Sequence, residues 1–393
     1  MRVVGVICEY NPFHKGHAYH LGRARAMSGA DYVVCVMSGS VTQRGSFARH
    51  DKWTRARMAL HHGADLILEL PARFACASAQ EFAAGGVHLL ASLGVLTHLS
   101  FGCEKESLPQ LSAAAKALSG ETPAFKSALR AQLDRGMPYP RARALAAQET
   151  SGIGNLAEII ARPNAALALE YLAALPKSIA PVPVPREGAG YHDEAIAELS
   201  SATAVRAAIA RGDMEAALCA VPSPDLLAAA EARGDIHDEE SLTQALLYRL
   251  RTEKAQTLRA IVGMDEGLEY RFLSAAKTAK TREELLSLIK TKRYTHARLS
   301  RLCTLSLLGV TREFAAENSK PTYARVLGFR REAAPLLNEI KKRSSMPLVT
   351  KAADYSDPLF ALDVRAQDLW ALGCASPQFR CAGRDYTTSP VIL

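Results

Sequence analysis

The arrangement of hydrophobic residues changes about midway along the chain. In the first two hundred residues, short runs of consecutive apolar residues alternate with segments whose apolar positions recur at helical spacing. Such short runs are typical of strands that are buried on both faces of a sheet. The predicted strands are Val3–Cys8, Asp31–Met37, Asp65–Leu70, Thr97–Phe101 and Ser178–Val184. The predicted helices are Gly16–Met27, Asp51–His62, Ser78–Leu93, Asn164–Leu175 and Ser201–Arg211.

Strands that alternate with helices of this length predict an α/β fold with a doubly wound parallel sheet. The prolines of the last predicted segment make it either an edge strand or an extended segment, because proline cannot donate a hydrogen bond to a neighbouring strand. Ligands of such sheets bind beyond the carboxyl ends of the strands. Functional residues are therefore expected in the loops after Cys8, Met37, Leu70, Phe101 and Val184.

From about residue 215 onward the pattern is helical and strand patterns nearly vanish. The predicted helices there are Met214–Cys219, Pro224–Ala232, Ser241–Lys254, Leu268–Ala279, Arg282–Lys290 and Thr295–Leu308. We therefore expect an α/β domain over residues 1–220, an α-helical domain over residues 221–350 and a C-terminal extension over residues 351–393. The last dozen residues are expected to be poorly ordered, as chain termini commonly are.

Composition and charge narrow the possible partners. The 393 residues are 48% hydrophobic and 22% charged, which is typical of a globular protein and excludes a disordered chain. The net charge of +8 points to a polyanionic partner such as a nucleotide or RNA. The apolar run at the N-terminus is cut off by Glu9, so neither a signal peptide nor a membrane span is predicted, and a cytoplasmic location is expected. The cysteines form no CxxC pair and are expected to be free thiols.

The first predicted strand ends in the polar segment Glu9–His17, with the sequence EYNPFHKGH. Gly16 allows the backbone to approach a ligand closely, and the N-terminus of the helix that follows attracts anions. His14 and His17 stand three residues apart, so they lie on the same side of a first helical turn. There the two imidazoles can donate hydrogen bonds to phosphate oxygens. The alternatives are that the pair only caps the helix, or that it binds a metal together with His20.

Other polar residues follow the remaining predicted strands, and each has two interpretations. The segment Ser38–Gly45 either cradles a phosphate or carboxylate, using Arg44, or is a flexible connection. Gly102 either lets a base or ribose pack against the backbone or is a turn residue. Asn164 either contacts a ligand or caps a helix. Arg186 either reaches a phosphate or is a surface charge.

A second anion-binding element is predicted near residue 201. In the sequence SSATAVR, Ser201 caps a predicted helix and Arg206 follows about a turn and a half later. Hydroxyls at a helix N-terminus, with an arginine nearby, suit an anion. An ordinary serine-capped helix is the alternative for this element taken alone.

Taken together, these motifs resemble a known superfamily. The pair PxHxGH and SSATAVR is similar to the HIGH-type nucleotidyltransferases, whose fold is a Rossmann-like doubly wound sheet. Longer stretches resemble one family in particular, the bacterial tRNA(Met) cytidine acetate ligases. These stretches are GVICEYNPFHKGHAYHL, VMSGSVTQRG, DKWTRARMALHHGADLILELP, SAQEFAAGGVHLL, PNAALALEYL, SSATAVR, TKRYTHARLSRL and YARVLGF.

The resemblance implies a two-step acylation. Acetate and ATP would form acetyl-adenylate and pyrophosphate, and the acetyl group would then pass to the wobble cytidine of elongator tRNA(Met), giving N4-acetylcytidine. By position in the family, the catalytic residues would be His14, His17 and Arg206. The residues implied for binding ATP are Ile7, Cys8, Glu9, Tyr10, Asn11, Pro12, Phe13, His14, Lys15, Gly16, His17, His20, Gly102, Asn164, Arg186 and Ser201. Mg²⁺ is expected to accompany ATP with few protein ligands, and no dedicated protein metal site is predicted.

Basic residues of the helical domain are the predicted tRNA contacts. The residues concerned are Lys292, Arg293, Arg298 and Arg301. Contacts of this kind with phosphates give affinity but little choice of sequence. A solvated helix face is the alternative for such a cluster.

Two other functions are the alternatives to an acetate ligase. A HIGH-type nucleotidyltransferase that acts on a small metabolite would use the same ATP loop but would need no basic helical domain. A non-catalytic RNA-binding protein would have no reason to retain His14, Gly16, His17 and Arg206 together.

Overall fold

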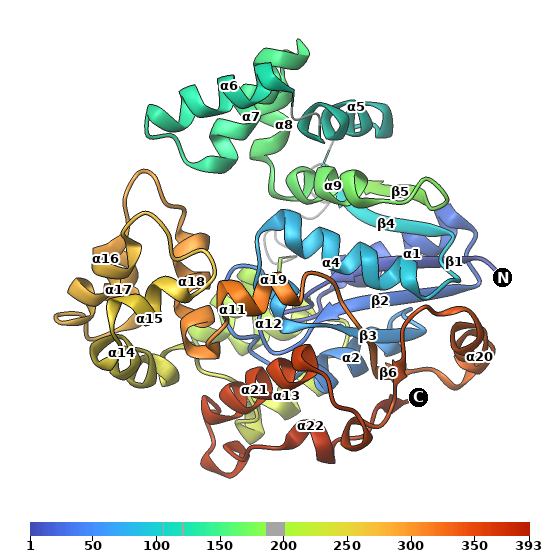
Figure 1. Ribbon diagram of the computed structural model, residues 1–393. Helices are drawn as coiled ribbons and strands as arrows, with labels where there is room; N and C mark the ends of the chain where they lie inside the picture. The colour runs from blue at the N-terminus through green and yellow to red at the C-terminus, as the bar shows by residue number, and fades with distance from the viewer. Residues whose placement is uncertain (105, 120–121, 186–200) are drawn as a thin grey trace.

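A computed structural model describes residues 1–104, 106–119, 122–185 and 201–393 of the chain (Figure 1). An eight-stranded sheet forms its centre, in the order β5-β4-β1-β2-β3-β6-β7, with β8 pairing to β6. The strands from the first half are β1 (Val3–Cys8), β2 (Tyr32–Ser38), β3 (Leu66–Leu70), β4 (His98–Cys103) and β5 (Ala180–Pro185). These five strands are parallel, and the proline-rich β5 occupies the predicted edge position. The predicted doubly wound α/β sheet is therefore confirmed.

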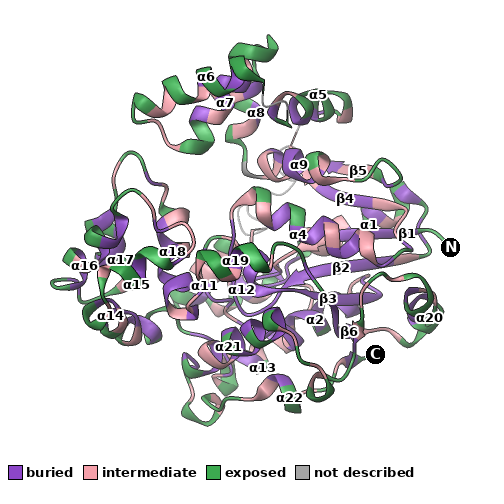
Figure 2. Ribbon diagram, viewed as in Figure 1, coloured by how far each residue is buried: buried purple, intermediate pink, exposed green. Residues whose placement is uncertain are grey.

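Helices cover the sheet on two faces, each with its own apolar cluster. One face carries α1 (Lys15–Ser28), α2 (Lys52–His61), α11 (Ala202–Ala210), α12 (Met214–Ala220) and α13 (Pro224–Arg233). The other carries α3 (Ala72–Ala75), α4 (Ala79–Ser92) and α9 (Pro163–Ala174). In Figure 2 the central strands are almost wholly buried, whereas the outer helices are exposed on one side. Burial on both faces explains why the strands appear in the sequence as unbroken apolar runs.

The second half of the chain also contributes strands, which corrects the expectation that strand patterns vanish there. The additional strands are β6 (Ala324–Phe329), β7 (Leu348–Val349) and β8 (Val391–Ile392). β6 pairs antiparallel to β3, so the sheet is mixed at this side. The expected disorder of the last dozen residues is also wrong, because Val391 pairs with Gly328 of β6. β7 and β8 are only two residues long, which is too short for a hydrophobic pattern to register.

Four helices between β4 and α9 were not predicted from the sequence. They are α5 (Leu108–Ser119), α6 (Pro123–Asp134), α7 (Tyr139–Ser151) and α8 (Leu156–Ala161). In Figure 1 they project as a separate group beyond the edge strand β5. In α7 the buried residues are all alanines, Ala142, Ala144, Ala146 and Ala147, which make a weak hydrophobic pattern.

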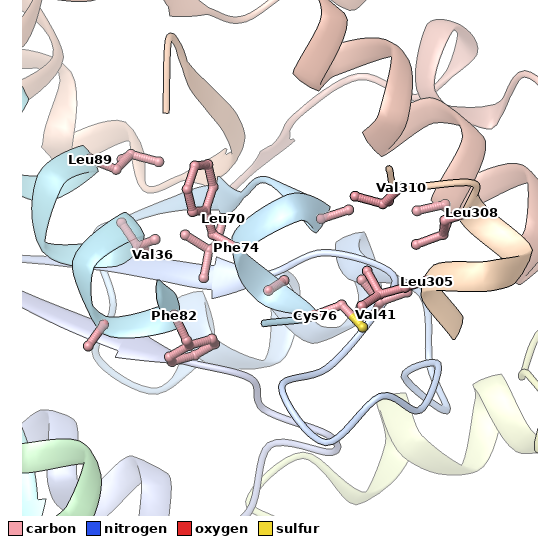
Figure 3. Packing of buried hydrophobic residues seen from close by; sticks show 14 of the residues in the cluster. Val36, Val41, Leu70, Phe74, Cys76, Phe82, Leu89, Leu305, Leu308 and Val310 are labelled. Carbon is pink, nitrogen blue, oxygen red and sulfur yellow. The ribbon is translucent and has the colours of Figure 1, made fainter. Parts of the chain in front are cut away.

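A second helical group lies beyond the carboxyl ends of the strands, at the left in Figure 1. It contains α14 (Thr243–Thr252), α15 (Ala255–Ala260), α16 (Leu268–Ala276), α17 (Arg282–Ile289), α18 (His296–Leu308) and α19 (Arg312–Glu317). Figure 3 shows Leu305 of α18 beside Val41 and Cys76, at the meeting of this group with the sheet region. The remaining helices are α20 (Ala334–Arg343), α21 (Pro358–Leu372) and α22 (Arg384–Thr387).

A buried group of charged side chains joins three distant parts of the chain. Lys52 Nζ lies 2.7 Å from Glu69 Oε1 and 2.7 Å from Asp385 Oδ1. Arg325 of β6 completes the group, with Nη1 3.1 Å from Glu69 Oε2 and 2.5 Å from Asp385 Oδ1. Two cations and two carboxylates thus neutralise one another, which offsets the cost of removing them from water. The C-terminal segment is therefore part of the central packing of the molecule.

Within the described ranges, every helix is too short or too polar to cross a bilayer. All eight cysteines are free, and five of them are buried.

Candidate functional site

The segment between β1 and α1 brings two imidazoles to the start of the helix. His14 is the N-cap residue of α1, and its Nδ1 accepts a hydrogen bond from the backbone N–H of Gly16 at 3.1 Å. His17 Nδ1 accepts from the backbone N–H of His14 at 3.2 Å, which completes a capping box. A neutral imidazole whose Nδ1 accepts a hydrogen bond carries its proton on Nε2. Both rings are therefore arranged to donate through Nε2. The capping interpretation is confirmed, and the phosphate-binding interpretation, which is compatible with it, stays a prediction.

The aromatic residues of the same segment hold the second imidazole in place. The rings of Tyr10 and Phe13 are buried and lie 4.8 Å and 5.6 Å from the ring of His17, between centroids. His14 and His17 stack with their centroids 3.6 Å apart. Lys15, by contrast, is exposed at the first position of α1. The site therefore pairs rigidly packed rings with one exposed ammonium, which suits a charged ligand at the helix start.

The end of β1 and the residues Asn11 and Pro12 pack into the protein interior. Ile7 packs under α4, where it would meet a Cβ placed on Gly86. Cys8 Sγ lies 3.7 Å from the carbonyl oxygen of Val36 in β2. Asn11 and Pro12 are buried, so this part of the loop is fixed by the protein interior.

The predicted second anion element reaches the first, across 195 positions of sequence. Ser201 caps α11 by accepting from the N–H of Ala204 at 3.1 Å. Arg206 on this helix donates from Nη1 to the backbone carbonyl of Asn11. Burial lowers the pKa of Arg206, and the neighbouring carboxylate of Glu9 opposes that shift. The tertiary structure thus places a guanidinium directly beside the EYNPFHKGH loop.

Two predicted residues are found at β4, the strand next to β1: Gly102 lies near its end, and His20 of α1 contacts it through Ser100. His20 Nε2 lies 3.1 Å from Ser100 Oγ, and burial lowers the pKa of His20 to about 4. The imidazole is therefore neutral near pH 7 and ties α1 to β4. A Cβ added to Gly102 would meet no atom within 4 Å, so the space above this glycine is open toward the site. Gly102 follows Ser100 by two positions, which places both on the face of the sheet that α1 covers.

Asn164 lies in the first turn of α9, at the same edge of the sheet. Its Nδ2 donates to Glu104 Oε1 at 2.9 Å, so it is tied to the loop that follows Gly102. Glu104 Oε2 is buried and has no partner in the described part of the chain. Arg186, also predicted for this site, lies outside the described residues.

Four hydrogen bonds missed by the sequence analysis involve the end of β1 and the segment Ser38–Gly45, which begins at the end of β2 and is called the second loop. The N–H of Gln43 donates to Glu9 Oε1 at 2.7 Å and joins this loop to the end of β1. Arg55 of α2 donates to the carbonyls of Glu9 at 2.7 Å and Ser38 at 2.9 Å, and also to that of Gly39. One buried guanidinium thus ties the ends of β1 and β2 together. The only sequence sign of Arg55 was the string DKWTRAR, which periodicity places on a helix without revealing its partners.

The second loop is also attached to the helical group. The carbonyl of Gly45 accepts from Arg282 Nη2 at 2.8 Å, Ser300 Oγ at 3.1 Å and Thr304 Oγ1 at 2.6 Å. Gly45 has φ of 80°, and a Cβ there would overlap the backbone of α18, 2.6 Å from the carbonyl carbon of Ser300. Three donors on one carbonyl and a close backbone approach hold this loop against α18.

The four predicted RNA contacts have unlike surroundings. Lys292 and Arg293 are exposed, and Arg293 lies 2.7 Å from Glu266 in an exposed ion pair. Arg298 lies over the ring of Tyr294 at 5.1 Å. Arg301 instead donates to the carbonyl of Gln43 at 3.1 Å, and burial lowers its pKa. The first three lie around the start of α18, whereas Arg301 faces the second loop.

No group of three or more histidine, cysteine or acidic side chains among the described residues is arranged to hold a metal ion. The donor set therefore fits Mg²⁺ only as an ion bound mainly by the phosphates of a nucleotide. The carboxylates described at this edge of the sheet include Glu9, Glu69, Glu104 and Glu106, of which Glu69 and Glu106 are already paired with cations.

Comparisons with known proteins find relatives along the whole length of the chain. A family model described as HIGH Nucleotidyl Transferase matches residues 1–385. A relative from Acetivibrio thermocellus named tRNA(Met) cytidine acetate ligase is 39% identical over 418 residues, with 100% of both chains covered. A relative of the same name from Syntrophomonas wolfei is 37% identical, covering 100% of this chain and 99% of its own. The crystal structure of Thermotoga maritima TmcAL bound with alpha-thio ATP is 31% identical with a TM-score of 0.93, covering 100% of each chain. The chain therefore belongs to the HIGH nucleotidyl transferase family, and within it to the proteins named tRNA(Met) cytidine acetate ligase.

Proposed function

We propose that the protein is an ATP-dependent ligase that acetylates N4 of the wobble cytidine of elongator tRNA(Met). Acetate and ATP form acetyl-adenylate and pyrophosphate, and acetyl transfer then gives N4-acetylcytidine and AMP. The observation that carries the proposal is the junction of the EYNPFHKGH loop with Arg206, in a chain matched along its whole length by relatives of that name. The nucleotide bound to the related Thermotoga maritima protein supports ATP as the cosubstrate.

The first step requires charge stabilisation on the phosphates. An acetate oxygen attacks the α-phosphorus of ATP and displaces pyrophosphate, so negative charge builds on the departing group. His14 and His17 donate from Nε2 to these oxygens, because backbone N–H groups already occupy their Nδ1 atoms. Arg206 adds a fixed positive charge at the same loop. Mg²⁺ bound to the phosphates would supply further neutralisation.

The second step brings the anticodon loop to the same edge of the sheet. The wobble base must be splayed out of its stack, as bases of single-stranded RNA commonly are. Lys292, Arg293 and Arg298 lie near the start of α18 and are proposed to contact tRNA phosphates. Arg301 is proposed to position the second loop through Gln43. The protein would act in the cytoplasm, where its tRNA substrate is found.

Incubation with labelled acetate, ATP and total tRNA, followed by digestion to nucleosides, tests this function. Labelled N4-acetylcytidine supports the proposal. Acetate-dependent ATP–pyrophosphate exchange without labelled RNA would instead indicate a ligase for a small acceptor. If neither labelled N4-acetylcytidine nor acetate-dependent exchange is detected, the proposed enzyme activity is contradicted.

A further inference from the structure

The second step of the proposed reaction needs an acceptor for a proton of the cytidine amine, and the imidazoles are badly placed for this role. Both Nδ1 atoms of His14 and His17 already accept backbone hydrogen bonds. Their Nε2 atoms therefore carry protons in the neutral rings and donate. Arg55 and Arg206 are cations and have no lone pair to offer.

Glu9 has the required chemistry and a suitable position. Its Oε1 accepts from the N–H of Gln43 at 2.7 Å, which fixes the carboxylate at the junction of the two loops. Among the described residues, no hydrogen bond to the other oxygen, Oε2, accompanies this one, and the side chain is only half-buried. One carboxylate oxygen is thus anchored while the other is available to a substrate.

Glu9 also lies on the side of the site from which RNA would arrive. Ile7 packs against α4, and Glu9 acts electrostatically on Cys76 and Tyr171, which belong to the apolar cluster on that same face, opposite α1 and its imidazoles. Arg301 of α18 donates to the carbonyl of Gln43, and the N–H of Gln43 donates to Glu9, so α18 is linked to Glu9 through one residue. A mixed anhydride held at its phosphate by the imidazoles would extend its acetyl group across the end of β1 toward this carboxylate.

The charges around Glu9 leave it basic enough for the task. Burial raises the pKa of Glu9, and the hydrogen bond from Gln43 and the cations only partly oppose that shift. Its own charge acts in turn on neighbouring groups: it adds to the effect of burial in raising the pKa of Tyr171, and at Cys76 it opposes the lowering of the pKa by Arg301 and Arg282. The groups that face it from the packed elements are Arg44, Arg55, Cys76, Tyr171 and Arg206.

We propose that Glu9 is the general base of the acetyl-transfer step, an inference that rests on the proposed function. N4 of the cytidine attacks the acetyl carbonyl carbon of acetyl-adenylate and a C–N bond forms. The bond between that carbon and the phosphate oxygen breaks, and AMP leaves with its electron pair. Glu9 Oε2 takes the proton from N4 and releases it to water after the products depart.

The substitution Glu9→Gln separates the two steps, because the amide oxygen can still accept from Gln43 while the base is lost. Because Glu9 is also among the residues implied for binding ATP, acetate-dependent ATP–pyrophosphate exchange is expected to fall too, but by less than acetyl transfer, so the ratio of the two rates is the readout. Acetyl transfer in a single turnover on tRNA(Met) is expected to fall by about 100-fold or more, the usual size of general-base catalysis. Glu149→Gln, the same charge change on an exposed position of α7, is the matched control and should leave both steps unchanged.

The pH dependence gives a second readout. In the wild type, transfer should rise with pH through a pKa above the ordinary glutamate value, and Glu9→Gln should remove this rise. Unchanged transfer in Glu9→Gln would overturn the assignment, and so would an equal loss of exchange and transfer, which would place Glu9 in ATP binding alone. A wild-type protein that exchanges pyrophosphate but never acetylates tRNA would overturn the proposed function itself, a result distinct from either.

Discussion

At the scale of single residues, the hydrogen-bonded tautomers of two imidazoles carry most of the argument for phosphate chemistry. His14 and His17 are each held through Nδ1 by a backbone N–H at the start of α1. The cap uses the Nδ1 edge of each ring, and the proposed role as a donor to phosphate uses the opposite Nε2 edge.

The substitution His17→Ala is expected to abolish acetate-dependent ATP–pyrophosphate exchange, with a loss of more than about 100-fold in rate. The fold should survive, because the lost hydrogen bond to His14 is worth only about 1 kcal/mol. Thermal unfolding monitored beside the exchange assay separates the two effects. Exchange at the wild-type rate would remove His17 from the proposed mechanism.

The substitution Gly45→Ala tests the close packing of the second loop. Its φ of 80° and the close approach of the backbone of Ser300 and Arg301 leave no room for a Cβ. Strain and overpacking together should lower the free energy of unfolding by about 2–4 kcal/mol. Gly136→Ala is the matched control, since Gly136 has φ of 77° but a Cβ added there would meet no atom within 4 Å. A comparable loss in both variants would show that only the backbone conformation matters.

At the scale of elements, hydrogen-bonded ion pairs between loops and helices fix how the helices pack against the sheet. Glu231 of α13 accepts from Arg49 at 2.6 Å and from His50 at 2.9 Å, in the segment that leads into α2. Burial alone would raise the pKa of Glu231, but the two hydrogen-bonded partners outweigh it and lower the pKa to about 2. This tie fixes α13 beside the segment that positions Arg55.

A depressed carboxyl pKa contributes stability that is present above the unfolded pKa and lost as pH falls through the folded one. For Glu231 the contribution is complete above about pH 4.5 and disappears toward pH 2. The shift corresponds to at most about 3 kcal/mol. Chemical denaturation between about pH 6 and pH 3 should therefore show a decline that is smaller in Glu231→Gln. Parallel pH profiles for the two proteins would contradict this account.

The elements also show where prediction from sequence succeeds. All five strands of the first half were predicted to within three residues at each end, because burial on both faces leaves continuous apolar runs. The alanine-rich helix α7 and the short strands β7 and β8 were missed, since neither leaves a strong periodic pattern.

At the scale of the whole molecule, the basic residues fall into separate places. Lys342 and Arg343 of α20 line a cavity of about 710 Å³ together with Met1 and Thr97, at the amino ends of β1 and β4. Arg293 and Arg298 lie with the helical group at the carboxyl side. The net positive charge therefore includes residues on opposite edges of the sheet.

Charge reversal at Arg293 and Arg298 together is expected to weaken tRNA binding about tenfold or more at moderate salt, since phosphate contacts dominate such affinity. Acetate-dependent pyrophosphate exchange should be nearly unchanged. The same reversal at Lys342 and Arg343 is the control and should leave tRNA affinity intact, because these residues lie at the other edge of the sheet. Unchanged affinity in the first variant, measured by filter binding, would refute the proposed RNA surface.

The C-terminal segment is expected to be essential to stability. Replacing Asp385 by alanine leaves Lys52 and Arg325 with Glu69 as their remaining partner in the buried charged group. The loss should be about 3–5 kcal/mol, which is large against ordinary domain stability. Equilibrium denaturation measures it, and an unchanged midpoint would show that the charged group is not needed.

By itself the sequence determined the alternation of strands and helices, the serine-capped helix start at Ser201, and the edge of the sheet at which a ligand is expected. These features depend on neighbours within a few positions, so a local pattern records them. Only the tertiary structure decided that Arg206 meets the carbonyl of Asn11, that Gln43 anchors Glu9, and that Asp385 lies beside Lys52. Contacts of this kind join residues far apart in the chain, and no periodicity of hydrophobic positions encodes which distant side chain will supply the partner.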